Sequence, residues 1–288
     1  MKPEKFGFVG LGQMGGPMAT NIVAAGFPLT VYDKAGTQGL APEGAELSAS
    51  VADVARGSDT IFLSLPDGPI SLSVIDEIAA VLDRRAGVVI DLSTIGPEAA
   101  REAAKRCADA GLIYIDSPVS GGQAGARAAT IAVMLAGPKD VVDAHMGILK
   151  GFAKNPFHVG TEPGQGQALK ILNNFLSGTA LAASTEAVLY GLSAGLDMKT
   201  ITDVVSVSSG YNSAINEKFP KRILTETFDA GFATALQSKD VKLYLENVKS
   251  AGTPSRVGQL VCDIWDEHNE ARPGSDITHL FEFIRDGE

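Results

Sequence analysis

The sequence predicts an α/β protein in which a doubly wound, mostly parallel sheet is followed by an all-helical domain. Two observations lead to this prediction. From residue 5 to residue 159, short apolar runs alternate with helical patterns, which is typical of parallel strands covered by helices on both faces. Beyond residue 192 the strand signals stop, and the sequence continues in helical patterns alone.

The spacing of apolar residues divides the first half into strands and helices. Continuous apolar runs predict buried strands, and apolar residues at helical spacing predict helices. The predicted strands cover residues 5–9, 29–33, 60–65, 88–92, 113–116, 130–136 and 156–159. The predicted helices cover residues 14–25, 51–56, 70–82, 97–110 and 139–149. Residues 124–128 are expected to form a loop.

A glycine-rich turn lies between the first strand and the first helix. Its spacing, Gly-x-Gly-x-x-Gly, assigns a separate task to each glycine: a tight turn, close approach of the backbone to a pyrophosphate, and close packing of helix on strand. Asp33 ends the second strand, where a carboxylate meets a ribose 2′-OH. This Rossmann-type arrangement predicts a dinucleotide site. Its expected cofactor-binding residues are Gly10, Leu11, Gly12, Gln13, Met14, Gly15 and Asp33.

The same carboxylate sets an expectation for the cofactor. Asp33 would repel a 2′-phosphate, so NAD is favoured over NADP. The positive charge of Lys34, the next residue, would weaken this repulsion, so NADP remains the alternative.

Three later strand ends carry polar or turn-forming residues, namely Leu65-Pro66, Ser93-Thr94 and Ser120-Gly121-Gly122. Ligands in such sheets bind beyond the carboxyl ends of the strands. A serine hydroxyl followed by two bare backbone amides suits a carboxylate. Ordinary turn chemistry is the alternative interpretation at all three places.

The stretch of residues 164–192 predicts one long helix. Its apolar residues fall on all sides at a helical period, so we expect it to be buried all round. Lys170 and Asn174 share one face of its first turns. A buried lysine is costly to desolvate and therefore needs a reason. The alternative is a core helix whose lysine reaches solvent.

We expect this helix to bridge two domains and to direct Lys170 into the cleft between them. The first, residues 1–162, is the predicted dinucleotide-binding domain, and residues 163–288 form a helical substrate and oligomerisation domain. Further helices are predicted at residues 198–207, 213–225, 232–251, 255–268 and 276–285.

Composition narrows the class of protein. With 288 residues, 45% hydrophobic and 20% charged, the chain resembles an ordinary two-domain protein. Its net charge of −10 argues against nucleic acid and anionic membranes as partners. Cys107 and Cys262 are far apart in helical contexts, which favours a reducing compartment without disulfides. We find no metal-ligand cluster, no signal peptide and no membrane span, and expect a cytoplasmic protein.

Taken together, four motifs in order resemble the 3-hydroxyisobutyrate dehydrogenase (β-hydroxyacid dehydrogenase) family, over essentially the whole chain. They are Gly-Leu-Gly-x-Met-Gly from Gly10, Asp-Ser-Pro-Val-Ser-Gly-Gly from Asp116, Gly-x-Gly-x-x-x-Lys-x-x-Asn-Asn from Gly164, and Lys-Asp from Lys239. Val241 replaces the usual Leu of the last motif, and Lys242-Leu-Tyr-Leu follows where small residues are common.

This resemblance implies roles for individual residues. It implies that Leu65, Pro66 and Thr94 line the nicotinamide half of the cofactor. Ser120, Gly121 and Gly122 are expected to hold the substrate carboxylate, with Asn174 supporting either the substrate or Lys170. Lys239 is expected near both substrate and nicotinamide, and Lys170 is implied as the catalytic general acid and base.

The implied activity is hydride transfer between NAD(P) and a small 3-hydroxy acid or its semialdehyde. In the reduction direction a Lys170 ammonium stabilises the developing oxyanion and delivers the proton. In the oxidation direction the lysine must first be neutral, so burial or a second cation such as Lys239 must lower its pKa.

Other readings of the same sequence are an imine reductase or another reductase, a decarboxylating phosphogluconate-type enzyme, and a non-catalytic NAD-binding sensor. Imine reductases usually lack the lysine, and the phosphogluconate-type enzyme has a much longer helical half. A sensor needs no proton donor. We expect a homodimer or homotetramer, whereas the identity of the hydroxy acid, with Tyr211, Asn212 and Phe232 as candidate contacts, stays open.

Overall fold

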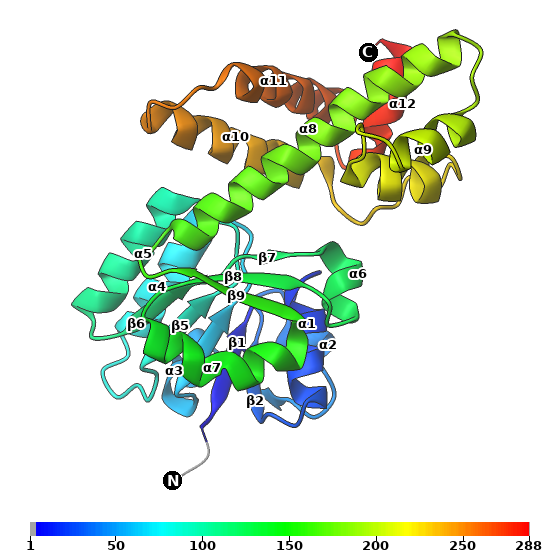
Figure 1. Ribbon diagram of the computed structural model, residues 1–288. Helices are drawn as coiled ribbons and strands as arrows, with labels where there is room; N and C mark the ends of the chain where they lie inside the picture. The colour runs from blue at the N-terminus through cyan, green and yellow to red at the C-terminus, as the bar shows by residue number, and fades with distance from the viewer. Residues whose placement is uncertain (1–3, 288) are drawn as a thin grey trace. The chain divides into compact units, whose positions relative to one another are not determined.

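The computed structural model describes residues 4–287. It consists of two compact units, of which the first runs to Lys170 and the second begins at Ile171. Figure 1 shows the elements of both units and the continuous course of the long helix α8.

The first unit is built on one sheet, and nine strands form it within residues 4–287. The strand order is β3-β2-β1-β4-β5-β6-β8-β7, with β9 paired to β8. Strands β1 to β6 pair in parallel, whereas β8 is antiparallel to β6 and β7 and parallel to β9. Their bounds are β1 (Phe6–Val9), β2 (Leu29–Tyr32), β3 (Glu46–Leu47), β4 (Thr60–Leu63), β5 (Val88–Asp91), β6 (Ile113–Asp116), β7 (Val119–Ser120), β8 (Ala132–Ala136) and β9 (Asn155–Gly160).

Helices cover both faces of this sheet. Because neighbouring strand residues point to opposite faces, Phe8 and Phe62 belong to one hydrophobic core and Val9 and Leu63 to another. Helices α1 and α7 contribute to the first core, and α3, α4 and α5 to the second. The helices are α1 (Gly15–Ala24), α2 (Thr37–Leu40), α3 (Val51–Gly57), α4 (Gly68–Ala79), α5 (Pro97–Asp109), α6 (Gly122–Arg127) and α7 (Lys139–Phe152). The predicted doubly wound fold is confirmed.

The second unit is helical and has a core of its own around Trp265, Phe219 and Phe281. Its elements are most of α8 (Gln165–Ser193), then α9 (Met198–Ser206), the π-helix η1 (Ala214–Ile223), α10 (Thr234–Ser250), α11 (Arg256–Ala271), the 3₁₀ turn η2 (Ile277–His279) and α12 (Leu280–Asp286). The π-helical hydrogen bonding of η1 was not predicted. Leu224 N donates to Phe219 O, five residues back, as in a π-helix. Pro220, which has no N–H to donate, lies within the same segment.

Two predictions about local structure are wrong. Residues 124–128 are not a loop, because most of them belong to α6. This short helix has too few residues to show a period, and it is held from outside by Asn21 on α1, whose Nδ2 donates to Ala126 O at 2.6 Å. Helix α8 is also not buried all round, since Leu176 is 58% exposed and Tyr190 76% exposed.

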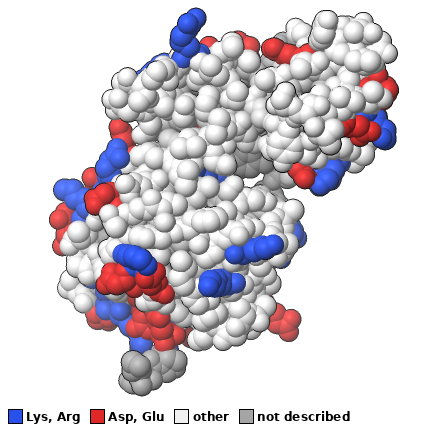
Figure 2. Space-filling model, viewed as in Figure 1, with Lys and Arg blue, Asp and Glu red and all other residues white. Residues whose placement is uncertain are grey.

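In the part of the chain that the structure describes, no helix is both long and apolar enough to cross a bilayer. Cys107 and Cys262 are buried free thiols. Acidic and basic side chains lie next to one another on the face seen in Figure 2.

Candidate active site

The loops expected to bind ligand all begin at one edge of the sheet. Strands β1, β4, β5 and β6 are parallel, and their last residues are in register: Val9 pairs with Leu63, Leu63 with Asp91, and Asp91 with Asp116. The glycine-rich turn, the Leu65-Pro66 loop, the Ser93-Thr94 loop and the segment before Ser120 therefore leave the sheet side by side.

The three glycines of the first turn differ in what surrounds them. Gly10 has φ +95°, and a Cβ there would overlap the carbonyl oxygen of Ser64. A Cβ at Gly15 would overlap the carbonyl oxygen of Gly10, because α1 starts against β1. At Gly12 a Cβ would meet no atom within 4 Å, its own chain neighbours aside, in residues 4–287. The fold needs the first two glycines, whereas Gly12 leaves a space that fits an approaching pyrophosphate.

Asp33 is fixed against this turn. Its Oδ2 accepts from Leu11 N at 2.6 Å, and its Oδ1 accepts from Ala35 N at 2.7 Å. A half-buried carboxylate thus stands beside the glycine-rich turn, as dinucleotide recognition requires. On the other side of the turn, Gln13 Oε1 accepts from Gln123 Nε2 of α6 at 2.5 Å. Of the remaining turn residues, Leu11 is buried and Met14 packs partly buried on the first core.

Backbone contacts also hold the next two loops. Leu65 N donates to Ser93 Oγ at 2.8 Å, which ties the loop after β4 to the loop after β5. Pro66 is exposed and Thr94 half-buried. After β7, Ser120 is half-buried, and Gly121 and Gly122 have φ values of +136° and +62°.

The first turn of α8 rests on Asp116. Asp116 Oδ2 accepts from Gly164 N and from Gln167 N, each at 3.0 Å, and Oδ1 accepts from Gln167 Nε2 at 2.8 Å. Burial, opposed by the bonds from Gln167 and reinforced by the neighbouring Asp91, raises the pKa of Asp116 to about 7. Burial likewise raises the pKa of Asp91.

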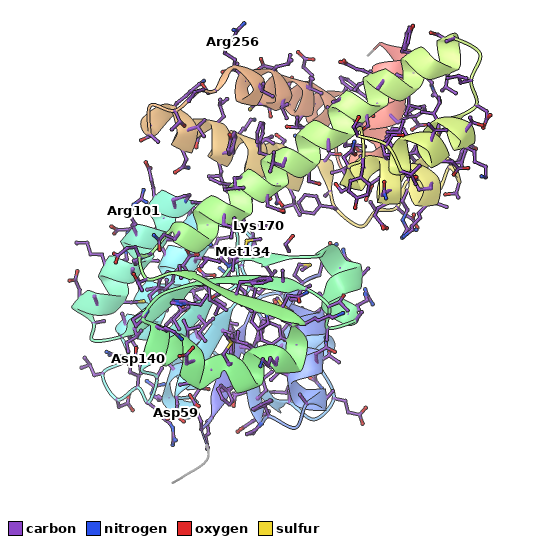
Figure 3. The ribbon with its side chains drawn as sticks, viewed as in Figure 1. Asp59, Arg101, Met134, Asp140, Lys170 and Arg256 are labelled. Atoms are coloured by element: carbon purple, nitrogen blue, oxygen red, sulfur yellow. The ribbon has the colours of Figure 1, made fainter. Side chains whose placement is uncertain are left out.

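Lys170 follows on the same helix, where Figure 3 labels it. Lys170 is only 8% exposed. The alternative of a lysine that reaches bulk solvent is therefore inconsistent with the structure, and a buried amine stands one helical turn after Gln167.

In the second unit, the predicted site residues Asn174 and Lys239 both interact with the carboxylate of Asp240. Asn174 Nδ2 donates to Asp240 Oδ2 at 2.5 Å, and Gln237 Nε2 donates to Asn174 O at 3.0 Å. Lys239 Nζ lies 3.5 Å from Asp240 Oδ1. The motif that begins at Gly164 and the Lys-Asp motif are thus joined by side chains.

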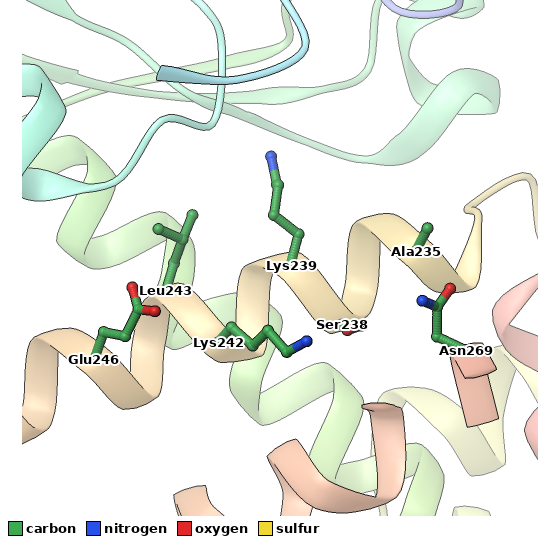
Figure 4. Close-up of a pocket in the computed structure, with 7 residues that line it drawn as sticks. All are labelled: Ala235, Ser238, Lys239, Lys242, Leu243, Glu246 and Asn269. Atoms are coloured by element: carbon green, nitrogen blue, oxygen red, sulfur yellow. The ribbon is translucent and has the colours of Figure 1, made fainter. Parts of the chain in front are cut away.

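Lys239 also lines a pocket of about 370 Å³. The pocket is lined by Ala235, Ser238, Lys239, Lys242, Leu243 and Glu246 of α10 and by Asn269 of α11. Figure 4 shows that Lys239 and Lys242 leave α10 in different directions. Lys242 forms an ion pair with Asp266 at 2.9 Å. Between residues 4 and 287, no three His, Cys, Asp or Glu side chains are grouped so that they could hold a metal ion.

Comparison with known proteins assigns the chain to a family. Residues 5–160 match the NAD binding domain of 6-phosphogluconate dehydrogenase, and residues 164–284 match the family described as NAD-binding of NADP-dependent 3-hydroxyisobutyrate dehydrogenase. The chain is 35% identical to 3-hydroxyisobutyrate dehydrogenase of Pseudomonas aeruginosa over 291 residues, covering 96% of this chain and 97% of that one. It belongs to the 3-hydroxyisobutyrate dehydrogenase family.

Other members show the breadth of the family. The chain is 36% identical to 2-(hydroxymethyl)glutarate dehydrogenase of Eubacterium barkeri, over 92% of this chain and 89% of that one. The structure of 3-hydroxyisobutyrate dehydrogenase of Mycobacterium tuberculosis with L-serine superposes with a TM-score of 0.91 at 30% identity, covering 98% and 99% of the two chains. An imine reductase of Streptomyces aurantiacus shares the fold, with a TM-score of 0.65 at 20% identity.

Membership confirms the predicted enzyme class, an NAD(P)-dependent hydroxyacid dehydrogenase, and its nicotinamide cofactor. Sequence reasoning missed three residues of the site, namely Asp116, Gln167 and Asp240. Each stands within a motif that the sequence displays, but its partners lie far along the chain, as the separation of 51 residues between Asp116 and Gln167 illustrates.

The raised pKa of Asp116 predicts a pH-dependent stability. The pKa is about 7 in the folded protein against 3.8 for an unperturbed aspartate, so unfolding releases a proton between these pH values. Wild-type stability therefore falls as pH rises from about 4 to about 7, by up to about 1.4 kcal/mol per pH unit from this group. The Asp116→Asn variant has no carboxyl group at this position, so this pH-dependent contribution to its free energy of unfolding is absent.

Urea unfolding of both proteins at several pH values checks this expectation. The free energy of unfolding of Asp116→Asn, taken relative to wild type, should rise with pH up to about pH 7 and then level off. A difference that stays constant over the whole range would contradict the raised pKa.

Proposed function

We propose that the protein oxidises a small 3-hydroxy acid to its semialdehyde with NAD, or carries out the reverse reduction, and that Lys170 is its general acid and base. The observation that carries this proposal is the buried Lys170. It stands one turn beyond a helix start that is bonded to the loop after β5 and to Asp116, the last residue of β6, at the sheet edge that also bears the glycine-rich turn.

We propose for the two units the roles that the sequence predicts. We assign the dinucleotide to the first, where the turn residues Gly10, Leu11, Gly12, Gln13, Met14 and Gly15 and the carboxylate of Asp33 would hold it and where Leu65, Pro66 and Thr94 would line its nicotinamide half. Ser120, Gly121 and Gly122 would bind the substrate carboxylate. From the second unit, Asn174 and Lys239 would contribute to substrate binding, and Lys239 to the cofactor.

In this reaction the protein itself has to transfer one proton. When bound, the cofactor would supply the hydride as NADH or accept it as NAD. A Lys170 ammonium near the carbonyl oxygen stabilises the charge that develops there and donates the proton, and in the other direction the amine takes the proton from the hydroxyl. At about 4 Å and an effective dielectric constant of about 20, one such charge pair contributes roughly 4 kcal/mol.

The names of the relatives suggest a substrate class. Relatives are named for 3-hydroxyisobutyrate, 2-(hydroxymethyl)glutarate and L-serine. All three molecules carry a CH₂OH group next to the carbon that bears the carboxylate, and they differ in the substituent on that carbon. We propose that this enzyme acts on a 2-substituted 3-hydroxypropionate and that the substituent sets its specificity.

Two finer features belong to the same proposal. Leu176 and Tyr190 of α8 are exposed in the single chain, which supports assembly into a homodimer or homotetramer. The buried free thiols of Cys107 and Cys262 support a cytoplasmic location, since reducing compartments keep thiols free.

Lys170→Ala tests the proposed general acid and base. We expect kcat to fall by about 10³-fold or more, because both the proton transfer and the charge stabilisation are lost, while the Kd for NADH changes less than threefold. Absorbance at 340 nm with a panel of 2-substituted 3-hydroxypropionates, glycerate and 4-hydroxybutyrate measures turnover. Lys199→Ala, which removes an exposed lysine of α9 paired with Asp203, is the matched control. Near-normal turnover of Lys170→Ala would exclude Lys170 from the reaction.

Asp33→Ala tests cofactor choice. Loss of the carboxylate removes both its attraction for the ribose hydroxyls and its repulsion of a 2′-phosphate. We expect kcat/KM for NAD to fall about 10- to 100-fold and that for NADP to rise, so that the preference for NAD shrinks. Asp140→Ala, which removes an exposed carboxylate of α7 (Figure 3), serves as the control. An unchanged ratio of the two kcat/KM values would contradict the role of Asp33.

A further inference from the structure

A fully buried polar pair, Asp116 and Gln167, lies beneath the start of α8. Both residues are 0% exposed. Gln167 Oε1 accepts from Ile95 N at 2.9 Å and from Gly96 N at 3.1 Å. Its Nε2 donates to Ser93 O at 2.9 Å and to Asp116 Oδ1 at 2.8 Å. The side-chain amide of Gln167 thus uses both of its protons and both of its lone pairs.

Each half of this pair requires its own residue type. Asp116 receives only N–H donors, so an acceptor with two oxygens is needed. Gln167 must accept at one end and donate at the other. A glutamate in its place would lose both donated bonds and would set a third carboxylate beside Asp116 and Asp91. The pair is therefore more closely specified than a simple helix cap, for which several short polar residues serve.

The backbone of α8 is also brought unusually close to Asp116. A Cβ at Gly166 would overlap the carbonyl oxygen of Met134 on β8 and would lie 3.0 Å from Asp116 Oδ2. Gly164 has φ +92°, and a Cβ there would lie 2.9 Å from Pro97 O. These two glycines let the first turn of the helix pack directly against the end of β6, the middle of β8 and the start of α5.

Three segments with proposed functions meet at this pair. The loop after β5 contains Thr94, the strand that ends at Asp116 leads to Ser120, and the helix turn leads to Lys170. Gln167 bonds to the loop on both sides of Thr94, through Ser93 O and Ile95 N. Lys170 stands three residues after Gln167, so both lie on one side of the helix.

We propose that Asp116 and Gln167 are positioning residues that fix the direction in which Lys170 leaves α8 relative to the loop that carries Thr94. This inference rests on the proposed function of Lys170. Helix capping explains why Asp116 accepts from Gly164 N and Gln167 N. It does not explain why the Gln167 side chain also bonds to Ser93 O, Ile95 N and Gly96 N of the loop after β5. A fully satisfied buried network of this kind restricts the loop and the helix turn to one relative placement.

Gln167→Met tests the proposal, because it keeps the volume of the side chain and removes its hydrogen bonds. Gln165→Met is the matched control, because Gln165 is exposed, lies in the same turn and accepts from Glu162 N, with no bond to Asp116 or to the loop after β5 in the described residues. The direct readout needs no substrate. Acetic anhydride labels lysine amines, and the rate at which Lys170 is labelled between pH 6 and pH 10 is measured by peptide mass spectrometry.

In Gln167→Met we expect the Lys170 labelling profile to shift, with at least a threefold higher rate at neutral pH, while Gln165→Met follows wild type. We expect kcat to fall 10- to 100-fold and KM for NAD to change less than threefold. Thermal unfolding shows whether each variant is folded. If Gln167→Met does not fold, Asp116→Asn, which keeps one acceptor oxygen, is measured in its place with the same expectations.

A folded variant whose Lys170 labelling profile coincides with that of wild type would overturn the proposal, whether or not turnover falls. A labelling shift without any loss of kcat would overturn it as well. If the wild type turns over no hydroxy acid, the proposed function fails, and the labelling experiment still decides whether the pair positions Lys170.

Discussion

The start of α8 depends on one buried carboxylate. The first N–H groups of any helix have no partner within the helix, and where the helix begins inside the protein another group must accept them. Asp116 accepts from Gly164 N and Gln167 N, and a helix of 29 residues follows. The side chain at the end of β6 thus decides where α8 begins, and with it the register of every residue that α8 presents.

Prediction from sequence succeeded where the signal is local. Strand runs, helical periods and the Gly10–Gly15 turn are read from neighbouring residues, and the doubly wound sheet follows from them. The six-residue helix α6 was not predicted, because the hydrogen bond that anchors it comes from Asn21, more than a hundred residues away. The π-helical hydrogen bonds of η1 have no local signal in the sequence, and the exposed side of α8 depends on which residues pack against it. The motif residues could be predicted as site residues, but the sequence does not show the partners of Asp116 and Asp240, most of which lie far along the chain.

Two carboxyl groups at the ligand edge of the sheet are buried. Asp91 and Asp116 stand in register at the ends of adjacent strands, where the expected ligands are anions. Two ionised carboxylates there would repel such ligands. Burial raises the pKa of both groups. Because the pKa of Asp116 is raised to about 7, this group holds less than a full negative charge near neutral pH. Asp33, half-buried and bonded to Leu11 N, remains as the acid suited to a ribose. The overall charge of −10 therefore says little about this edge.

The glycines of the two Gly-x-Gly motifs separate into those that the fold needs and one that it does not. Gly15 and Gly166 have no room for a Cβ, because carbonyl oxygens of Gly10 and Met134 lie against them. These positions would demand glycine even in a protein that bound nothing. Gly12 has open space instead, so packing within the described residues does not require glycine there, and the space suits a pyrophosphate that approaches the backbone closely. A sequence shows all of them as the same letter, and the distinction between a packing glycine and a ligand glycine is physical, since it rests on which atoms occupy the place of the missing Cβ.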